Sequence, residues 1–309
     1  MAAYGESGFF GRHYHAPEGP DGGYTADQLA FLRENQKIGG CLLSVAGEGP
    51  GCLRHLTLEQ WTAHVDAVFD RLEPGATPAD VFRGMASAIA AAEGKTITVE
   101  KTPHHLNWID RILAHLPEAR FVVMLRDPYG FLLSYKHIGD HRAEAIRRRF
   151  RNRYHPLAGA IVWRGSQRSA DAAARLGDDR VLLVTQEDVS HRSSEVLDRV
   201  QRFFGLAVHD LSNAVPPDNT SFVRGARPEL RSDDIFWMNL IAGRDLAAAG
   251  YERGPVGGGL GRIAWSVIRL PWWAVHNLVV MRRFVRGSVA GYLLRWVRGQ
   301  RPAATEASS

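Results

Sequence analysis

The chain has 309 residues, of which 45% are hydrophobic and 23% charged, enough to bury a core of ordinary size. The net charge of +5 is uneven, because residues 256–309 carry eight Arg, no Lys and one Glu. The rest of the chain is therefore close to neutral. This distribution excludes a diffuse nucleic-acid-binding surface and indicates a single basic appendage.

Helical patterns alternate with short apolar runs along the chain. Helices are predicted, in chain order, at 61–71, 80–92, 104–116, 128–137, 157–176 and 194–204. The first follows a capping box at Thr57 to Gln60, and the second follows Thr77-Pro78. Buried strands are predicted at 96–100, 121–125 and 181–184. This alternation is typical of a parallel sheet covered by helices on both faces.

The N-terminus and the cysteines bear on the compartment. The first residues have neither the basic start nor the apolar run of a signal peptide. The two cysteines, Cys41 and Cys52, are too few for a disulfide framework, and no Cys/His cluster suggests a metal. We therefore expect a cytoplasmic protein that requires no metal.

One polar segment follows the strand at 96–100. Glu100, Lys101 and a threonine stand at the strand end, and Pro103 then starts a helix. Ligands of open α/β sheets bind at the carboxyl ends of the strands. A carboxylate and an ammonium there suit a transfer reaction that needs a base and a cation beside the leaving group. The same two residues also suit a simple surface ion pair.

A second polar segment follows the strand at 121–125. Arg126 ends that strand, Pro128 starts a helix, and Ser134 lies two turns along it. An Arg fork and a hydroxyl can grip one phosphate, helped by the helix N-terminus. The alternative is an Arg that satisfies backbone carbonyls and a solvated Ser.

The two segments together resemble the PAPS-dependent sulfotransferases. The run EKTPHHLNWIDRILAHLPEARFVVMLRDPYGFLLSYKH is similar to the core of that family, which includes heparan sulfate N- and 3-O-sulfotransferases and bacterial carbohydrate and lipid sulfotransferases. Further likenesses are Trp163, the strand 181–189, the helix end 200–206 and the segment 6–10. The resemblance implies an α/β fold with a P-loop-NTPase-like parallel sheet flanked by helices, spanning residues 1–255.

The resemblance also implies roles for individual residues. Glu100 would be the base on the acceptor hydroxyl, and Lys101 would lie beside the transferring group. Arg126 and Ser134 would hold the 3′-phosphate of PAPS. Two weaker assignments place Arg224 and Gly225 in a loop over the nucleotide. His104 would face the acceptor, although a capping or solvated histidine is the alternative.

One part of the family pattern is missing. Members carry a strand and a phosphate loop ahead of the segment at Glu6, and this sequence holds no such loop. Gly94-Lys95-Thr96 precedes a strand instead of following one, so it is excluded as that loop. Two interpretations stay open: a true product that begins further upstream, or a relative without catalysis. The presence of the four core residues favours the first.

Residues 256–309 are predicted to form a basic, Trp/Arg-rich amphipathic tail. Arg262, Arg269, His276 and Arg283 recur every seven residues and so share one helical face. A membrane span is disfavoured, because charged residues and Pro271 interrupt the apolar window. The pattern favours an interfacial segment at 262–298, on the inner face of the membrane. The alternative is packing on the chain's own domain or on a second subunit.

The expected function is transfer of a sulfuryl group from PAPS to a hydroxyl of a carbohydrate or lipid-linked acceptor, with no metal and no nucleic-acid partner. A non-catalytic binding or scaffold protein of the same fold is the first alternative. A P-loop kinase is the second, and the absence of Walker residues argues against it.

Overall fold

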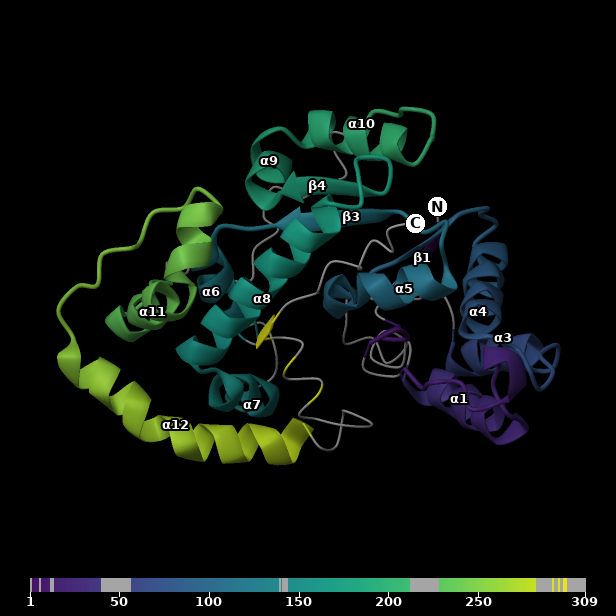
Figure 1. Cartoon of the computed structure of the whole chain (residues 1–309), viewed down its shortest axis with the longest axis horizontal. Helices are drawn as coiled ribbons and strands as arrows, with labels where there is room; N and C mark the ends of the chain where they lie inside the picture. The colour runs from purple at the N-terminus through teal and green to yellow at the C-terminus, as the bar shows by residue number, and fades with distance from the viewer. Residues whose placement is uncertain are drawn as a thin grey trace, which may run out of the picture. The chain divides into compact units, whose positions relative to one another are not determined.

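The computed structural model describes residues 2–5, 7–11, 14–39, 57–138, 140, 144–211 and 228–281, and positions 291, 294, 297 and 298 (Figure 1). The chain forms two compact units, Met1–Glu118 and Ala119–Ser309.

The first unit combines a strand pair with helices. Its elements are β1 (Ala2–Gly5), η1 (Pro20–Gly22), α1 (Ala26–Gly39), α3 (Leu58–Phe69), α4 (Pro78–Ala92), β2 (Thr98–Glu100), η2 (Pro103–Trp108) and α5 (Ile109–His115). β1 pairs with β2 in parallel, with Ala2 opposite Thr98 and Gly5 opposite Glu100. The end of β1 therefore lies beside the end of β2, at the edge where polar side chains were expected.

The helix starts in this unit follow the capping residues. Thr57 accepts a hydrogen bond from the Gln60 N–H, and the Gln60 side chain accepts one from the Thr57 N–H, so the predicted capping box is confirmed. Thr77 caps α4 in the same way with Asp80. Gly94 adopts a positive φ of 60° directly after α4. The Gly94-Lys95-Thr96 run therefore follows a helix and precedes β2, so it does precede a strand as the sequence indicated.

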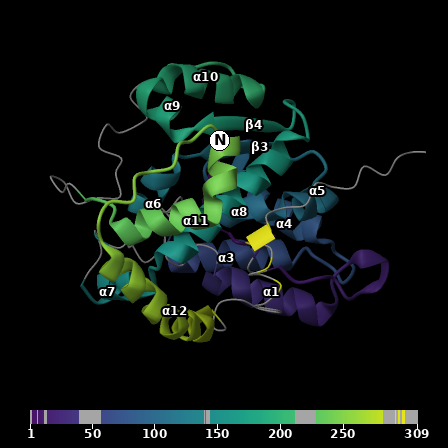
Figure 2. The ribbon, with the colours of Figure 1, turned by 60° about the vertical axis from the view of Figure 1, so that its left-hand side comes forward.

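The second unit also contains one parallel strand pair. Its elements are β3 (Phe121–Leu125), α6 (Pro128–Lys136), α7 (Glu144–Arg153), α8 (Pro156–Ala174), β4 (Val181–Thr185), α9 (Gln186–His191), α10 (Ser193–Phe203), α11 (Ser232–Ala248) and α12 (Leu260–Met281). β3 and β4 pair in register from Phe121–Val181 to Leu125–Thr185. Helix α8 lies on one side of this pair, and α9 and α10 lie on the other (Figure 2). The α/β class and the three predicted strands are confirmed.

Some side chains of the strands remain exposed. Val122 and Met124 point to one face of β3 and are 36% and 58% exposed, and Ile97 and Val99 around β2 are also exposed. Buried parallel strands usually have both faces covered by helices. Helices of the second unit still lie on both sides of the β3–β4 pair, as the sequence predicted, while these side chains stay accessible among the described residues (Figure 2).

Three helices form the core of the second unit. Leu132 of α6, Ala160 and Trp163 of α8, and Met238, Ala242 and Leu246 of α11 form one buried cluster. Asp234 of α11 is buried and accepts hydrogen bonds from Lys136 Nζ at 2.5 Å and from Tyr154 Oη at 2.6 Å. These contacts fix α6, the helix that follows Arg126, against α11.

Gly159 allows α6 and α8 to approach closely. A Cβ at Gly159 would lie 2.4 Å from Leu132 Cδ2, which is fully buried. We expect Gly159→Ala to lower the free energy of unfolding by about 1–3 kcal/mol, the usual range for overpacking a core. Gly257→Ala is the matched control, because its Cβ would meet no atom within 4 Å. Equal denaturant midpoints for the two variants would contradict this close packing.

Several elements were not predicted, namely β1, α1, α7, α9 and α11, and the helix expected at 104–116 is divided into η2 and α5. The division has a local consequence, because the tight turn of η2 brings His105 back towards the end of β2. Residues 256–281 lie within the second unit, where α12 packs on α11 and α7. The domain boundary expected at residue 255 stays a prediction.

Candidate active site

Glu100 ends β2 and is surrounded by hydrogen-bond donors. Its Oε1 accepts from the Ser7 N–H at 3.0 Å, from Ser7 Oγ at 2.7 Å and from Thr102 Oγ1 at 2.5 Å. Its Oε2 accepts from the Thr102 N–H at 3.2 Å and lies 2.8 Å from His105 Nδ1. Both oxygens of a largely buried carboxylate are thus held by residues from the turn after β1 and from the segment after β2.

The same turn fixes the tautomer of His105. The Phe10 N–H donates to His105 Nε2 at 3.3 Å, so this nitrogen is the acceptor of the ring. Nδ1 therefore carries the proton and donates it to Glu100. The histidine that contacts the predicted base is His105, whereas the sequence had singled out His104. His104 is half-buried in η2, and its acceptor role stays a prediction.

The charge of Glu100 is stabilised in this position. Burial opposes ionisation, but the hydrogen bonds from His105, Ser7 and Thr102 outweigh it, so the pKa of Glu100 lies below its ordinary value. The carboxylate is therefore ionised at neutral pH and fixed in orientation. It could accept a proton from an acceptor hydroxyl only where that hydroxyl replaces one of the present donors, of which the Ser7 hydroxyl is the closest chemical equivalent.

Lys101 follows Glu100 and is exposed, while Thr102 is buried. The Thr102 hydroxyl accepts from the Gly8 N–H at 3.0 Å and donates to Glu100. The alternation of buried and exposed side chains after β2 keeps the carboxylate fixed and leaves the ammonium at the surface.

Arg126 directly precedes the N-cap of α6, and Ser134 lies within that helix. A Cβ at Gly130 would lie 3.6 Å from Arg126 Nε, so the Arg126 side chain lies beside Gly130. Ser134 is four residues after Gly130 and therefore lies on the same helical face, one turn further on. The structure thus brings these two predicted residues to one face. The expected help from the N-terminus of α6 in holding a phosphate stays a prediction.

The surroundings of Arg126 hold its backbone firmly. Trp163 Nε1 donates to the Arg126 carbonyl at 3.1 Å, and the Asp127 N–H donates to Glu187 Oε1 at 3.1 Å. Asp127 caps α6 by accepting from the Gly130 N–H. Burial lowers the pKa of the guanidinium, opposed by the charges of Glu187 and Asp127. Among the residues that the structure describes, no carboxylate forms an ion pair with Arg126, so its charge is available to an anion.

Some predicted residues lie elsewhere. Arg224 and Gly225 fall outside the described residues. Glu100 and Lys101 belong to the first unit, and Arg126 and Ser134 belong to the second.

Ser7 and His105 were missed as contacts of Glu100. Ser7 lies in the segment 6–10 that resembles the family, but that likeness assigned it no role. His105 lies four residues after Lys101, in the segment that already contained the predicted catalytic residues. In the described part of the chain, no group of three His, Cys, Asp or Glu side chains is arranged to hold a metal ion.

Comparison with known proteins decides the family. The model of the sulfotransferase family matches residues 49–210, just over half of the chain, and this range includes Glu100, Lys101, Arg126 and Ser134. The chain belongs to the sulfotransferase family. This sulfotransferase matches no curated protein.

Two solved sulfotransferase domains are similar to this sulfotransferase in part. The sulfotransferase domain from the curacin biosynthetic pathway is 14% identical, with a TM-score of 0.44 over 75% of this chain and 89% of that one. The sulfotransferase domain of the Synechococcus PCC 7002 olefin synthase is 18% identical, with a TM-score of 0.38 over 72% of this chain and 84% of that one.

Proposed function

We propose that this sulfotransferase moves a sulfuryl group from PAPS to a hydroxyl of a carbohydrate or lipid-linked acceptor. The observation that supports it best is the ionised, fixed carboxylate of Glu100 in a chain of this family. In the reaction, the acceptor oxygen forms a bond to sulfur, and the bond from sulfur to the bridging phosphate oxygen breaks. The hydroxyl proton passes to Glu100, and adenosine 3′,5′-bisphosphate leaves.

The other residues bind and orient. Lys101 would supply positive charge to the leaving phosphate oxygen, and no metal is needed for that step. Arg126 and Ser134 would hold the 3′-phosphate, which fits a guanidinium without an ion pair among the described residues and a hydroxyl on the same face of α6. His104 would face the acceptor, and Arg224 with Gly225 would close over the nucleotide. No part of the proposal uses nucleic acid.

A second candidate function is supported by the same carboxylate. All the donors around Glu100 belong to the chain itself, so a purely structural Glu100 would suit a non-catalytic binding or scaffold relative. Incubation with 35S-labelled PAPS and a mixed glycan and glycolipid fraction separates the two. Label transferred to an acceptor supports the enzyme, and nucleotide binding without any transfer supports the relative.

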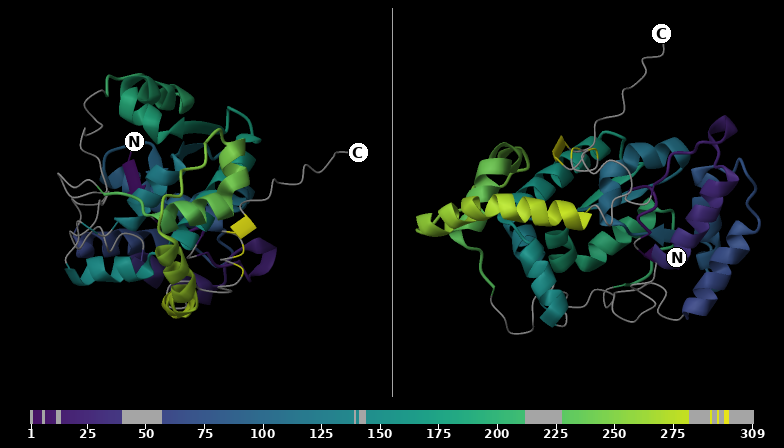
Figure 3. Two further views of the ribbon diagram at one scale, coloured as in Figure 1. Left: turned by 90° about the vertical axis from the view of Figure 1, so that its left-hand side faces the viewer. Right: turned by 90° about the horizontal axis from the view of Figure 1, so that it is seen from below.

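The proposal of a lipid-linked acceptor depends on the surface of α12, which is polar on its inward side and apolar on its outward side. Its inward side forms polar contacts: Trp237 Nε1 donates to Ser266 Oγ at 2.8 Å, and Trp273 Nε1 donates to the Arg153 carbonyl at 2.9 Å. Arg269 also points inward, to the Tyr154 carbonyl. Figure 3 shows α12 as one long helix.

The outward side of α12 is apolar, and we call it the α12 face. It consists of five side chains, each more than half exposed: Trp265, Ile268, Trp272, Val275 and Val279. Their spacing of three and four residues forms one continuous stripe. A helix of a soluble protein normally turns such a stripe to the core, so an exposed one indicates a docking surface. In the described part of the chain, no helix is long and apolar enough to span a membrane.

We infer that the α12 face rests on an anionic membrane surface, on the inner face of the cytoplasmic membrane. Residues 262–298 contain Arg but no Asp or Glu, and tryptophans favour the bilayer interface. A second copy is the weaker occupant, because pairing would bring two Arg-rich tails together. Arginines near an anionic leaflet contribute about 1 kcal/mol each. An acceptor linked to lipid would then lie within reach of the enzyme.

Two glutamates placed on the α12 face should release the protein from lipid. We expect Ile268→Glu with Val275→Glu to abolish sedimentation with phosphatidylglycerol vesicles, because each charge would enter the apolar interface. The matched control, Val208→Glu with Leu211→Glu, adds the same charges at exposed apolar positions outside α12 and should still sediment. Sedimentation of both would contradict the membrane contact, and a loss of dimers in the α12 variant alone would assign the face to a second copy.

A further inference from the structure

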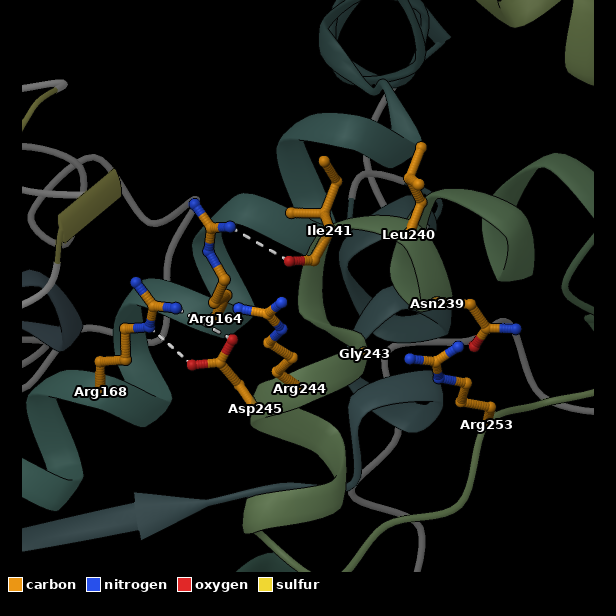
Figure 4. A pocket seen from close by; sticks show the side chains of 9 residues that line it. All are labelled: Arg164, Arg168, Asn239, Leu240, Ile241, Gly243, Arg244, Asp245 and Arg253. Carbon is orange, nitrogen blue, oxygen red and sulfur yellow. Dashed lines mark hydrogen bonds and ion pairs between the residues drawn. The ribbon is translucent and has the colours of Figure 1, made fainter.

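A second cationic site lies on the second unit, away from Arg126 and Ser134 in the sequence. Helices α8 and α11 and the segment after α11 enclose a pocket of about 280 Å³. Four of its side chains are arginines: Arg164 and Arg168 from α8, Arg244 from α11, and Arg253 (Figure 4). We call this the arginine pocket. Its lining contains a single carboxylate, that of Asp245.

The charges in the arginine pocket do not balance. Asp245 is fully used by Arg168, whose Nε lies 2.6 Å from Oδ1 and whose Nη2 lies 3.1 Å from Oδ2. Within the described ranges, no carboxylate forms an ion pair with Arg164, Arg244 or Arg253. Four guanidinium groups therefore line one small pocket that holds a single carboxylate, so its net charge is positive, an arrangement that self-repulsion disfavours.

Arg164 carries a direct sign of a missing partner. Its Nη1 donates to the Ile241 carbonyl at 3.1 Å, but its Nε is buried and makes no hydrogen bond within the described structure. Burial lowers the pKa of Arg164, and the neighbouring charge of Arg168 lowers it further. A buried donor without an acceptor is costly, so this side chain is prepared for an oxygen ligand.

Arg253 is held in place by its surroundings. A Cβ at Gly243 would lie 2.7 Å from Arg253 Nη2, so this guanidinium lies closely against α11 at that glycine. The next residue is tied to α6 and α11, because the Gly254 N–H donates to Tyr129 Oη, and Asn239 Nδ2 donates to the Gly254 carbonyl at 2.8 Å. Tyr129 Oη in turn donates to Asn239 Oδ1 at 2.6 Å. The pocket is thus pre-organised, which reduces the entropy lost on binding.

We propose that the arginine pocket binds a tetrahedral oxyanion, the phosphate or sulfate group of a second ligand. Guanidinium forks match the paired oxygens of such groups, and arginine recognises them better than a point charge does. The pocket holds one such group with a small substituent. None of its residues has a role in the proposed sulfuryl transfer, so the proposed anion site does not depend on that reaction.

Titration of the full chain with inorganic phosphate and with sulfate, at constant ionic strength and followed by calorimetry, tests the site. We expect saturable binding of both, at least tenfold weaker in Arg244→Gln with Arg253→Gln, since each lost charge-assisted bond weakens binding several-fold. Arg199→Gln with Arg202→Gln removes the same charge from α10 and should bind like the unchanged protein.

Each alternative outcome overturns the proposal. Absence of binding to the unchanged protein, or equal binding to the pocket variant, would remove the arginine pocket as a site. Loss of binding in Arg126→Ala alone would place the phosphate on α6, which supports the proposed function and contradicts the pocket. Equal affinity for acetate would contradict selectivity for a tetrahedral group.

Discussion

Glu100→Gln is expected to lower turnover with PAPS by about 10²–10⁴-fold, the usual contribution of a positioned general base. The amide keeps the size of the side chain but cannot take the hydroxyl proton. Nucleotide binding should change little, because the proposed function assigns the 3′-phosphate to Arg126 and Ser134. Turnover and adenosine 3′,5′-bisphosphate affinity of the two proteins are the measurements. Unchanged turnover would remove Glu100 as the base.

The surroundings of Glu100 add a structural consequence. A glutamine would turn an NH₂ group towards Ser7 and Thr102 or towards His105, all of which donate to the carboxylate. Leaving a buried donor without an acceptor costs about 1–3 kcal/mol, so the variant should also be less stable. Ser7→Ala separates the two effects. It keeps the carboxylate and removes one donor, so its stability should fall by about 1 kcal/mol with far less loss of turnover.

The lowered pKa of Glu100 also determines how the stability of the fold should change with pH. A carboxylate whose pKa is lower in the folded protein stabilises the fold above its unfolded pKa and loses that contribution as pH falls through the folded pKa. The unchanged protein should therefore lose stability relative to Glu100→Gln as the pH falls below the ordinary glutamate range. The difference in free energy of unfolding between the two proteins should become smaller.

Arg126→Ala is expected to weaken binding of adenosine 3′,5′-bisphosphate by about 10–100-fold, the cost of one or two charge-assisted hydrogen bonds. The physical reason is that, among the described residues, no ion pair occupies the guanidinium, although the charges of Glu187 and Asp127 act on it from nearby. Calorimetry on the two proteins measures the change.

Two further variants sharpen this test. Arg126→Lys keeps the charge but loses the planar fork, and should recover only part of the affinity. Arg199→Ala removes an arginine from α10 and should bind nucleotide like the unchanged protein. Equal affinity in Arg126→Ala would exclude Arg126 from the nucleotide site. Because half-buried Arg126 has backbone contacts with Trp163, thermal unfolding of each variant checks that the fold is intact.

The strands could be predicted because their apolar runs are short and bounded by polar residues. Phe121 to Leu125 is a β-strand over its whole predicted length, and β4 extends one residue past the prediction to Thr185. The capped starts of α3 and α4 were equally local signals. Helix α11 was not predicted although its buried residues recur at helical spacing, because its sequence contains no motif that indicated a catalytic or binding role.

The contacts of Glu100 could not be predicted, because they depend on the pairing of β1 with β2. A strand of four residues at the start of the chain has no periodic signal, yet it carries Ser7 to the carboxylate across 93 positions of sequence. The same holds for His105, whose direction is set by the turn of η2. By contrast, the order of strand, Arg126, helix and Ser134 is local, so it followed from the sequence alone.

The amphipathic character of α12 was predicted from its composition, but the side of the helix that faces the protein was not. The sequence placed Trp and Leu on one side and Arg on the other, whereas the structure turns Arg269 and Trp273 inward and Trp265 and Trp272 outward. Sequence periodicity identifies the faces of a helix, but only tertiary packing decides which face meets the protein.

If this sulfotransferase recognises the 3′-phosphate of PAPS, its affinity should differ between two nucleotides that differ in that phosphate. Calorimetric titration of the full chain with adenosine 3′,5′-bisphosphate and with adenosine 5′-monophosphate isolates that phosphate. The account predicts at least tenfold tighter binding of the bisphosphate, a preference that disappears in Arg126→Ala. Equal affinity for the two nucleotides, or a preference that survives in Arg126→Ala, would contradict it.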